Sequence, residues 1–355
     1  MKKQSSKGIN VFAHDYFNNL GGGENLALTF LKYNKSFYLL TFFITNFLKK
    51  KIFNKKTILI GNYKNKLSLL YNLFFFQIKK KVNYYIASGN YTPLLNIYNC
   101  EKKVFYCHSL PKFFFLYNKF YSKKRIFLYI LYLIISPIFK KIYIKKINKF
   151  DIIIANSNYT KNQLKKITSK KIYIIYPPIK IIKKKIRYNN FFIFNNRHEK
   201  EKNLDIAIKC FQTNKKYKLI ITSKGSLTKK LKEKCMNDKN IIFLGLVSRK
   251  KYEDLLSKCL GTLNISKHED FGMSAIETMA IGKPCIVLNQ GGYLETVTNN
   301  KNGFILDKNN IENSLNKFLN NIKITDIKKM KKNCFNQAKL FSENNFLKNM
   351  KKILL

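Results

Sequence analysis

The sequence has few acidic residues and no tryptophan. Its 355 residues include 68 lysines and arginines against 19 aspartates and glutamates, a formal net charge of +49. One interpretation is a polyanionic partner, either nucleic acid or an anionic membrane surface. The other is a coding sequence forced toward A and T, because lysine, asparagine, isoleucine, phenylalanine and tyrosine crowd both halves of the chain. The spread of lysine over both halves favours the second interpretation for most of the charge.

Paired cysteine motifs are also missing. The seven cysteines form no CxxC pair, which argues against a disulfide framework and against a zinc site. We interpret them as small core residues in a reducing compartment. The polar start of the chain, residues 1–8, lacks the apolar run of a signal peptide, so we expect a cytoplasmic protein.

No stretch is apolar for long enough to cross a membrane. The most apolar one, residues 126–139, is too short for a bilayer core of ~30 Å, which needs ~20 residues. It contains Ser136 and Pro137 and has basic residues on both sides, at 123–125 and 140–141. We expect a buried helix here. The second option is a helix lying in the membrane interface, which would attach the protein to the inner face of the cytoplasmic membrane.

The chain does contain alternating strand and helix patterns. A short apolar strand at 9–13 precedes three glycines at 21–23 and a helical pattern at 24–31. This order is typical of the start of a doubly wound α/β domain. Tyr176-Pro177-Pro178 cannot continue a central strand, because proline has no N–H to donate, and so marks a linker.

Beyond the linker the same alternation starts again. A strand is expected at 191–194, followed by a helix whose apolar residues Leu204, Ala207, Ile208 and Phe211 share one face. We therefore predict an α/β protein of two domains, with a helical tail behind them. The predicted parts are 1–177, 178–330 and the tail 331–355, and the further strands expected are 104–107, 151–155, 218–222, 241–244, 261–265 and 284–288.

The most informative chemistry lies near residue 270. Glu269 and Glu277 are carboxylates eight positions apart, and Gly272 between them is expected to begin a helix that ends near Gly282. The free N–H groups at the start of this helix would form an anion site, suited to a diphosphate. A nearby carboxylate would then accept hydrogen bonds from sugar or ribose hydroxyls. The N–H groups belong to Gly272, Met273 and Ser274.

These residues resemble the signature of glycosyltransferase family 4. The resemblance rests on Glu269-x7-Glu277 with Asp270-Phe271-Gly272 inside it, and on Gly291-Gly292 and Glu295 downstream. Arg197 and Lys202 stand where that family places its two diphosphate-binding cations. Two such charges would neutralise the leaving nucleoside diphosphate as the glycosidic bond breaks.

The N-terminal half resembles a subgroup that includes bacterial O-antigen mannosyltransferases. The similar motifs are His14-Asp15-Tyr16 with Gly22-Gly23-Glu24, then Tyr106-Cys107-His108-Ser109-Leu110-Pro111, Ala155-Asn156-Ser157 and Tyr176-Pro177-Pro178-Ile179. Three positions depart from the pattern. Asn196 replaces a glycine or serine, Lys112 stands where the subgroup often has arginine, and Ser223-Lys224-Gly225 replaces the Gly-x-Gly of the nucleotide loop.

The resemblance implies the fold called GT-B, in which two Rossmann-like domains face a cleft. It places the donor mainly on the C-terminal domain and the acceptor on the N-terminal one, with the C-terminal helix crossing back to the first domain. No Asp-x-Asp motif is present and the four histidines do not cluster in the sequence. We therefore expect transfer that needs neither a metal nor another cofactor.

The resemblance also implies a role for each site residue. Glu269 would bind the transferred sugar and Glu277 the ribose. Gly22 and Gly23 would let the backbone approach the diphosphate closely. His108 would contact the donor sugar or support the reacting centre. It would also lie on the acceptor side, together with His14 and Asp15.

The function implied is retaining transfer of a sugar from a nucleotide-sugar donor, with GDP-mannose the best guess. The acceptor would be a lipid-linked or other glycan in the synthesis of cell-surface polysaccharide such as lipopolysaccharide. Three alternatives stay open. They are a soluble sugar or sugar-phosphate synthase of the same fold, an inactive regulatory relative, and a basic nucleic-acid-binding protein. The last has no recognised motif in its favour, so no nucleic acid partner is expected.

Overall fold

The computed structural model describes residues 8–18, 20–52, 56–61, 71–73, 75–115 and 126–354. Two features discussed above, the polar start at 1–7 and the basic triplet at 123–125, lie outside these residues. The chain divides into two compact units between Pro177 and Pro178, inside the segment that the sequence marks as a linker. Unit 1 is Met1–Pro177 and unit 2 is Pro178–Leu355.

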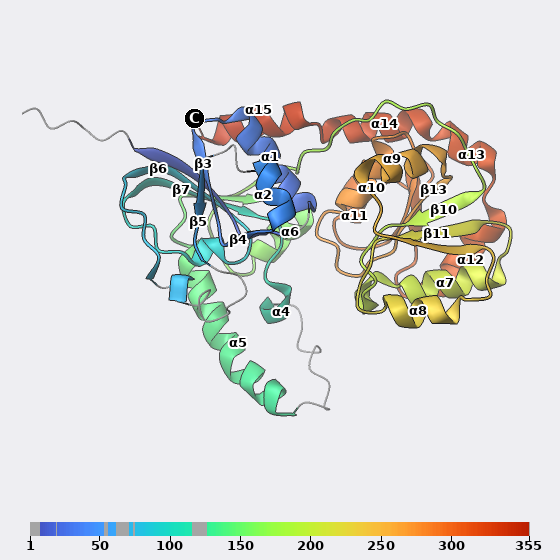
Figure 1. The fold of residues 1–355 in the computed structure, drawn as a ribbon, viewed down its shortest axis with the longest axis horizontal. Coiled ribbons are helices and arrows are strands. Elements are labelled where there is room, and N and C mark those ends of the chain that lie inside the picture. Colours follow the sequence, from blue (N-terminus) through green and yellow to red (C-terminus); the bar gives the residue numbers. More distant parts are fainter. Residues whose placement is uncertain are drawn as a thin grey trace, which may run out of the picture. The chain divides into compact units, whose positions relative to one another are not determined.

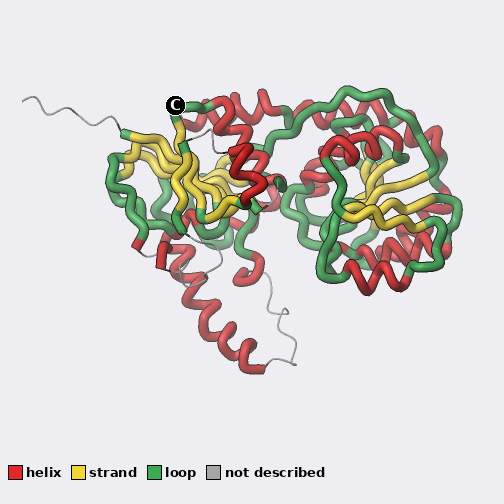
Figure 2. Tube along the Cα trace, viewed as in Figure 1, coloured by secondary structure: helices red, strands yellow, loops and turns green. Residues whose placement is uncertain are grey.

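Unit 1 is built on a seven-stranded parallel sheet with the strand order β5-β3-β1-β6-β7-β8-β9. Figure 2 shows the strands in yellow, with helices beside them. The buried residues of its strands are mostly apolar, as expected for a parallel sheet that is covered on both faces. The strands are β1 (Ile9–His14), β3 (Phe37–Thr41), β5 (Thr57–Leu59), β6 (Val82–Ser88), β7 (Cys100–Cys107), β8 (Ile152–Ala155) and β9 (Ile172–Ile174). A small parallel pair is formed by β2 (Tyr16–Phe17) and β4 (Phe43–Ile44).

The two faces of this sheet follow from the alternation of side chains along each strand. In β1, Phe12 points to the side of α1 (Gly22–Tyr33), where its ring lies 4.9 Å from the ring of Phe30. Val11 and Ala13 point to the other side, into a core that includes Tyr143. Other helical segments in the described part of unit 1 are α2 (Asn46–Ile52), η1 (Thr92–Leu94), α4 (Lys112–Phe115), α5 (Ile126–Ile147) and α6 (Asn158–Leu164).

The expectation of a buried helix at 126–139 is wrong. The helix α5 is longer, 22 residues, and several of its apolar side chains are exposed. A helix that is apolar all round predicts burial all round, but α5 packs only one of its faces on unit 1, through side chains such as Tyr143 and Ile147. Figure 1 shows its amino-terminal half standing clear of the strands of unit 1. Among the described residues, no helix is both long and apolar enough to cross a membrane.

Unit 2 is built on a six-stranded parallel sheet with the order β12-β11-β10-β13-β14-β15. All six strands are short, and five of them match strands expected from the sequence to within one residue at each end. The strands are β10 (Phe191–Phe194), β11 (Lys218–Thr222), β12 (Ile241–Gly245), β13 (Gly261–Asn264), β14 (Cys285–Leu288) and β15 (Gly303–Leu306).

The helices of unit 2 cover both faces of this sheet (Figure 1). Phe192 and Phe194 of β10 pack in one core with Phe211 of α7 (Leu204–Thr213), as the helical spacing of that segment predicts. Phe191 and Ile193 belong to the core on the opposite face. The other helical segments are η3 (Lys200–Lys202), α8 (Thr228–Lys234), α9 (Arg249–Lys258), α10 (Met273–Met279), α11 (Tyr293–Thr296), α12 (Ile311–Asn321) and α13 (Ile324–Lys329).

The tail forms two further helices, α14 (Lys331–Leu340) and α15 (Glu343–Leu354). Its contacts assign it to unit 2, where α14 packs against α10. The backbone N–H of Ile179 donates to the carbonyl oxygen of Phe341 at 2.7 Å, which ties the tail to the start of the unit. The expected packing of the tail on the N-terminal domain stays a prediction.

Candidate functional site

In each sheet, successive strands are first added on one side of a central strand and then on the other. The candidate residues lie at the two points where this order reverses, the switch points. In unit 1 the switch lies between β1 and β6, which are adjacent and parallel. His14 ends β1, Ser88 ends β6, and His108 directly follows the next strand, β7. In open α/β sheets, ligands bind beyond the carboxyl ends of the strands at such a point. The three side chains therefore lie in a row at the edge where a ligand is expected.

These three side chains form a hydrogen-bonded chain. Ser88 Oγ lies 3.2 Å from His14 Nδ1 and 2.7 Å from His108 Nε2. A hydroxyl has one proton to donate, so it donates to one imidazole and accepts from the other. The tautomers of the two neutral rings are thereby coupled. Ser88 was not predicted from the sequence, where its place at the end of an apolar strand before Gly89 was the only signal.

Both histidines are neutral at physiological pH. Burial, with a smaller contribution from the nearby His108, lowers the pKa of His14 to about 3. Burial likewise lowers the pKa of His108 to about 4. Neutral imidazoles each offer one donor and one acceptor, so this row is suited to contacts with hydroxyl groups and not to neutralising a charge.

The first turn of α1 approaches the histidines closely. A methyl group added at Gly23 would lie 3.0 Å from His14 Cε1 and 3.7 Å from His108 Cε1. The absence of a side chain at this position therefore keeps space above the imidazoles. Gly22 begins the same helix, and the carboxylate of Glu24 accepts a hydrogen bond from the Gly21 N–H at 3.1 Å.

Asp15 has a structural role that the sequence did not indicate. Its carboxylate accepts hydrogen bonds from the backbone N–H groups of Asn90, Tyr91 and Thr92, at 2.6, 3.0 and 2.9 Å. The residue is 6% exposed, and burial raises its pKa to about 6 although these three bonds oppose the change. Asp15 thus anchors the loop that follows β6, while its direct contact with an acceptor stays a prediction.

The switch point of unit 2 lies between β10 and β13. The loops that follow these two strands are held together by backbone and side-chain bonds. The Lys267 N–H donates to the Glu201 carbonyl at 2.8 Å, and Asn203 Nδ2 donates to the Ile265 carbonyl at 2.7 Å. These bonds bring a cation and a carboxylate of the predicted site together, residues 67 positions apart in the sequence.

That pair is Lys202 and Glu269. Lys202 Nζ lies 3.1 Å from Glu269 Oε2, and both side chains are largely buried, with 17% and 26% exposed. Lys202 ends the turn η3, and Glu269 lies in the loop before α10. Arg197, the other predicted cation, lies in the same loop as Lys202 and is exposed. The structure thus places two basic residues and one acidic residue at this edge of the sheet.

The loop after β14 closes against Glu269. The Gly292 N–H donates to the Glu269 carbonyl at 2.9 Å. Gly291 has φ 64°, and a Cβ there would lie 2.3 Å from the same carbonyl oxygen. The glycine pair of the predicted signature is therefore required by close packing of two backbone segments.

Helix α10 is shorter than predicted. It covers Met273–Met279 and stops three residues before Gly282, because Ala280 to Gly282 form a turn in which Gly282 has φ 77°. Gly272 is the N-cap residue, with φ 87°. The hydroxyl of Ser274 donates to Asn264 Oδ1 at 2.6 Å. The backbone N–H groups of Gly272, Met273 and Ser274 lie at the start of this helix, where they have no acceptor within the helix.

Glu277 is held by an arginine that the sequence did not single out. Arg249 Nη1 lies 2.8 Å from Glu277 Oε1, and Arg249 Nε lies 2.8 Å from Glu253 Oε1. The second pair is visible in the sequence as an i, i+4 spacing on α9. The first pair is not visible there, because its members are 28 positions apart. Arg249 therefore fixes one oxygen of the carboxylate that the sequence assigns to ribose.

His198 is a structural residue, although it lies within the predicted cation motif. It is fully buried, with Nδ1 2.9 Å from Thr228 Oγ1 and Nε2 3.2 Å from the Thr222 carbonyl. Its backbone packs against the Ser223-Lys224-Gly225 loop, where a Cβ on Gly225 would meet the His198 nitrogen at 2.5 Å. The glycine retained in this divergent loop is thus explained by packing.

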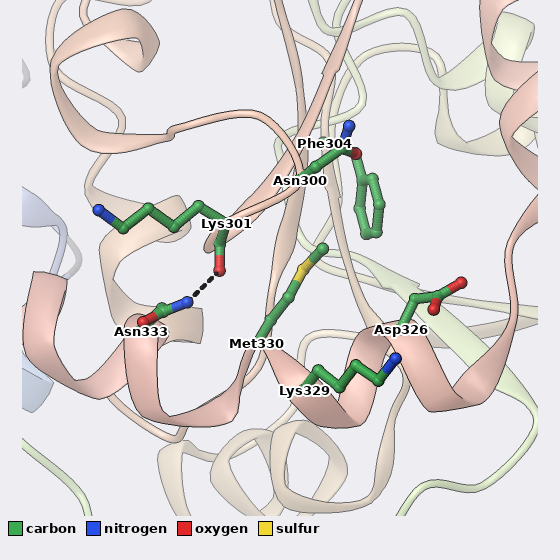
Figure 3. A pocket seen from close by; sticks show the side chains of 7 residues that line it. All are labelled: Asn300, Lys301, Phe304, Asp326, Lys329, Met330 and Asn333. Atoms are coloured by element: carbon green, nitrogen blue, oxygen red, sulfur yellow. Dashed lines mark hydrogen bonds between the residues drawn. The ribbon is translucent and has the colours of Figure 1, made fainter.

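A possible metal site and one surface hollow remain to be considered. Among the described residues, no group of three or more histidine, cysteine, aspartate or glutamate side chains is arranged to hold a metal ion. A hollow of ≈ 350 Å³ opens beside β15 (Figure 3). It lies by the amino end of that strand, at the opposite edge of the sheet from Glu269, so we assign it no part in the site. Its lining residues are Asn300, Lys301, Phe304, Asp326, Lys329, Met330 and Asn333.

Comparisons with known sequences agree on a family. Residues 179–340 match the family model described as glycosyl transferases group 1. An uncharacterized glycosyltransferase of Methanocaldococcus jannaschii is 34% identical over 189 residues, which make up 50% of this chain and 52% of that protein. The alpha-1,3/1,6-mannosyltransferase ALG2 of Dictyostelium discoideum is 25% identical over 327 residues, 76% of this chain and 74% of that protein. The match to the archaeal relative therefore spans about half of its length.

Solved structures agree on the fold. The crystal structure of Anabaena HepE in complex with UDP and glucose has a TM-score of 0.75 at 15% identity and covers 98% of this chain and 99% of that one. Sucrose-phosphate synthase from Thermosynechococcus elongatus has a TM-score of 0.72 at 13% identity, with 97% and 98% covered. With the two parallel sheets, these likenesses confirm the predicted α/β GT-B fold of two Rossmann-like domains. The facing of the domains across a cleft and the crossing of the C-terminal helix stay predictions.

Proposed function

We propose that this chain, whose residues 179–340 match the group 1 glycosyltransferase model and which has the GT-B fold, transfers a hexose from a nucleotide-sugar donor to a glycan acceptor, with retention and without a metal. The observation that carries this proposal is the Lys202–Glu269 pair at the switch point of unit 2. A cation and a carboxylate side by side suit a donor that has a diphosphate next to a sugar. No such pairing is needed to hold a nucleic acid, whose phosphates call for cations alone.

Unit 2 would bind the diphosphate. Lys202 and Arg197 would neutralise the charge that grows on the leaving nucleoside diphosphate, and the N–H groups of Gly272, Met273 and Ser274 would donate to its oxygens. The Lys202 ammonium has three protons, so it donates to a phosphate without releasing Glu269. This is electrostatic stabilisation by groups that are already in place before the donor binds.

The two carboxylates would orient the rest of the donor. Glu269 would accept hydrogen bonds from hydroxyls of the transferred sugar, and Glu277, held on one oxygen by Arg249, would accept from the ribose with the other. In a retaining transfer the leaving phosphate oxygen would help to take the acceptor proton. The neutral His108 and His14 of unit 1 would then serve as hydrogen-bonding partners of sugar hydroxyls and not as nucleophiles.

The donor that we propose is GDP-mannose. The support is the resemblance of the motifs at His14-Asp15-Tyr16 and Tyr106-Cys107-His108-Ser109 to mannosyltransferases, together with the ALG2 relative. A structural neighbour is described in complex with UDP and glucose, so a UDP-sugar is the competing donor. Loop contacts decide the base, and the loop at Ser223-Lys224-Gly225 is where this chain departs from its family's pattern.

For the acceptor we propose a lipid-linked glycan at an anionic membrane surface, on the cytoplasmic side, in the synthesis of cell-surface polysaccharide. The support is the net charge of +49 and the apolar helix α5. A water-soluble acceptor is the alternative that the transfer assay separates.

The proposal is tested by a transfer assay in EDTA. Purified protein is given GDP-mannose, UDP-glucose or ADP-glucose with a lipid-linked glycan, and the anomeric configuration of the product is read by NMR. We expect mannose transfer with retention at full rate in EDTA. Inversion, or activity that only manganese restores, would contradict the mechanism. Transfer to a free sugar phosphate alone would instead identify a synthase.

A further inference from the structure

Helix α5 presents a continuous apolar face to solvent. Ile130, Ile134 and Ile138 are 50%, 59% and 56% exposed, and Leu133 and Ile135 beside them are also exposed. The three isoleucines are spaced four residues apart, so they lie one above another over about 12 Å of helix. Isolated exposed apolar residues are ordinary, but a contiguous apolar patch marks an interaction surface.

The same face turns basic toward its carboxyl end. Lys141 and Lys145 are exposed, and at about 100° per residue they fall within the same arc of about 80° as the three isoleucines. Tyr132, Ser136 and Tyr143, which are buried, lie on the opposite side of the helix. The helix has no acidic residue. The exposed face therefore joins an aliphatic surface to positive charge, with no negative charge against it.

We infer that this face of α5 docks on an anionic lipid bilayer, with its isoleucines among the acyl chains and Lys141 and Lys145 at the headgroup phosphates. Such a helix lies in the plane of the interface and binds through apolar area and attraction to acidic lipids together. Protein interfaces depend instead on aromatic and arginine anchors. The exposed face from Ile130 to Lys145 has neither among its described side chains.

The placement of the face in the fold agrees with this use. Figure 1 shows the amino-terminal half of α5 standing out from the strands of unit 1, while Tyr143 and Ile147 anchor the other half in the core. The inference rests on the proposed function only for the biological role of the docking, which would bring unit 1 to a lipid-linked acceptor. The binding itself is a property of α5 and needs no sugar transfer.

The absence of tryptophan makes a direct test possible. The full chain with Ile134→Trp carries a single tryptophan on the face, and Met236→Trp carries one at a site in unit 2 that is 84% exposed. Each is mixed with vesicles of phosphatidylglycerol and phosphatidylcholine in equal parts, some with brominated acyl chains. We expect a blue shift and quenching by the brominated lipid for Ile134→Trp, and neither for Met236→Trp. Equal responses, or no response at low salt, would overturn the inference.

Sedimentation with the same vesicles measures the two parts of the face. Ile134→Glu with Ile138→Glu should weaken binding by about tenfold or more, while Met236→Glu with Leu340→Glu, both exposed positions of unit 2, should not. Lys141→Gln and Lys145→Gln should each weaken binding by about fivefold, and exposed lysines elsewhere, Lys239→Gln and Lys308→Gln, by less. Binding to pure phosphatidylcholine that equals binding to the mixture would contradict the role given to the lysines.

Three further outcomes can be told apart: the first concerns what covers the face, and the other two separate this inference from the proposed function. In the first, the fluorescence of Ile134→Trp is already blue-shifted without vesicles, and sedimentation equilibrium gives the mass of two chains. This result would show that a second copy covers the face. Vesicle binding through α5 in a protein that transfers no sugar would contradict the proposed function alone. Transfer to a lipid-free glycan by a protein that binds no vesicle would contradict the docking and the proposed membrane acceptor, while the sugar transfer itself would stand.

Discussion

Lys202 and Glu269 form a salt bridge of 3.1 Å between the loops that follow β10 and β13. The pair joins the two halves of the unit 2 sheet at the place where its winding reverses. With about three quarters or more of each side chain covered, removal of either partner leaves a largely buried charge without its counterpart, which is costly. The pair is therefore both a structural clamp and, in our proposal, the point where diphosphate and sugar meet.

Removal of either proposed cation should slow sugar transfer. We expect Arg197→Ala and Lys202→Ala each to lower kcat/KM by ~10²-fold or more, as loss of one preorganised charge stabiliser does. Lys200→Ala is the matched control, because Lys200 lies in the same loop and is exposed. Near-normal turnover in both variants, or an equal loss in the control, would remove the diphosphate assignment.

Arg249→Ala should weaken donor binding through Glu277. With its fixed oxygen released, Glu277 should hold the ribose less well, and we expect the donor KM to rise by about tenfold, as for loss of a charge-assisted hydrogen bond. The loss should be smaller with a 2′-deoxyribose donor, which offers fewer hydroxyls. Lys250→Ala, at the exposed next position, should leave both donors unaffected. If the two donors lose equally, Arg249 acts on folding alone.

Ser88→Ala should disturb both histidines at once. The hydroxyl bridges His14 Nδ1 and His108 Nε2, so its loss leaves two buried ring nitrogens without a partner. We expect transfer to fall by about tenfold, since an unsatisfied buried polar group costs about 1–3 kcal/mol. The nitrogen chemical shifts of both imidazoles should change, which reports tautomers directly. Ser88→Thr should keep both. Unchanged shifts in Ser88→Ala would contradict the coupling.

Acid should destabilise unit 1 through His108. Its pKa is about 4 in the folded chain and 6.5 in the unfolded one, so as pH falls below 6.5 the unfolded state takes up a proton first and stability decreases. Asp15, with a raised pKa of about 6, acts in the opposite direction. Between neutral pH and pH 4, the free energy of unfolding should therefore fall by on the order of 2–3 kcal/mol less in His108→Asn than in the wild type. Urea titrations measure this free energy at both pH values. An equal decrease in the variant and the wild type would contradict a buried, neutral His108.

The sequence predicts the fold well because its signals are local. Apolar runs such as 191–194 and the spacing of Leu204, Ala207, Ile208 and Phe211 fall on β10 and α7. Helix α5 was mispredicted for a physical reason. Its sequence is apolar on every side, and nothing local indicates that only the side with Tyr132, Ser136 and Tyr143 is covered.

Site residues were predictable where they stand in a motif, and not where the fold supplies a partner. Glu277 stands in the motif, but its contact with Arg249 joins two helices that the chain order keeps apart. Ser88 gains its role only because β6 lies between β1 and β7. Asp15 stands in a motif as well, yet its three bonds to residues 90–92 depend on strand pairing across 75 to 77 positions.

The most direct test of the account is calorimetric titration of the full chain and of Lys202→Ala with GDP, UDP and ADP. The central claim is that the switch point of unit 2 binds a nucleoside diphosphate through Lys202. We predict that GDP binds most tightly and that Lys202→Ala weakens it by about tenfold or more. If UDP binds about ten times more tightly than GDP, the proposal of GDP-mannose as donor is contradicted, while the proposal of a glycosyltransferase stands. Binding of none of the three, or equal binding by Lys202→Ala, would contradict the claim itself.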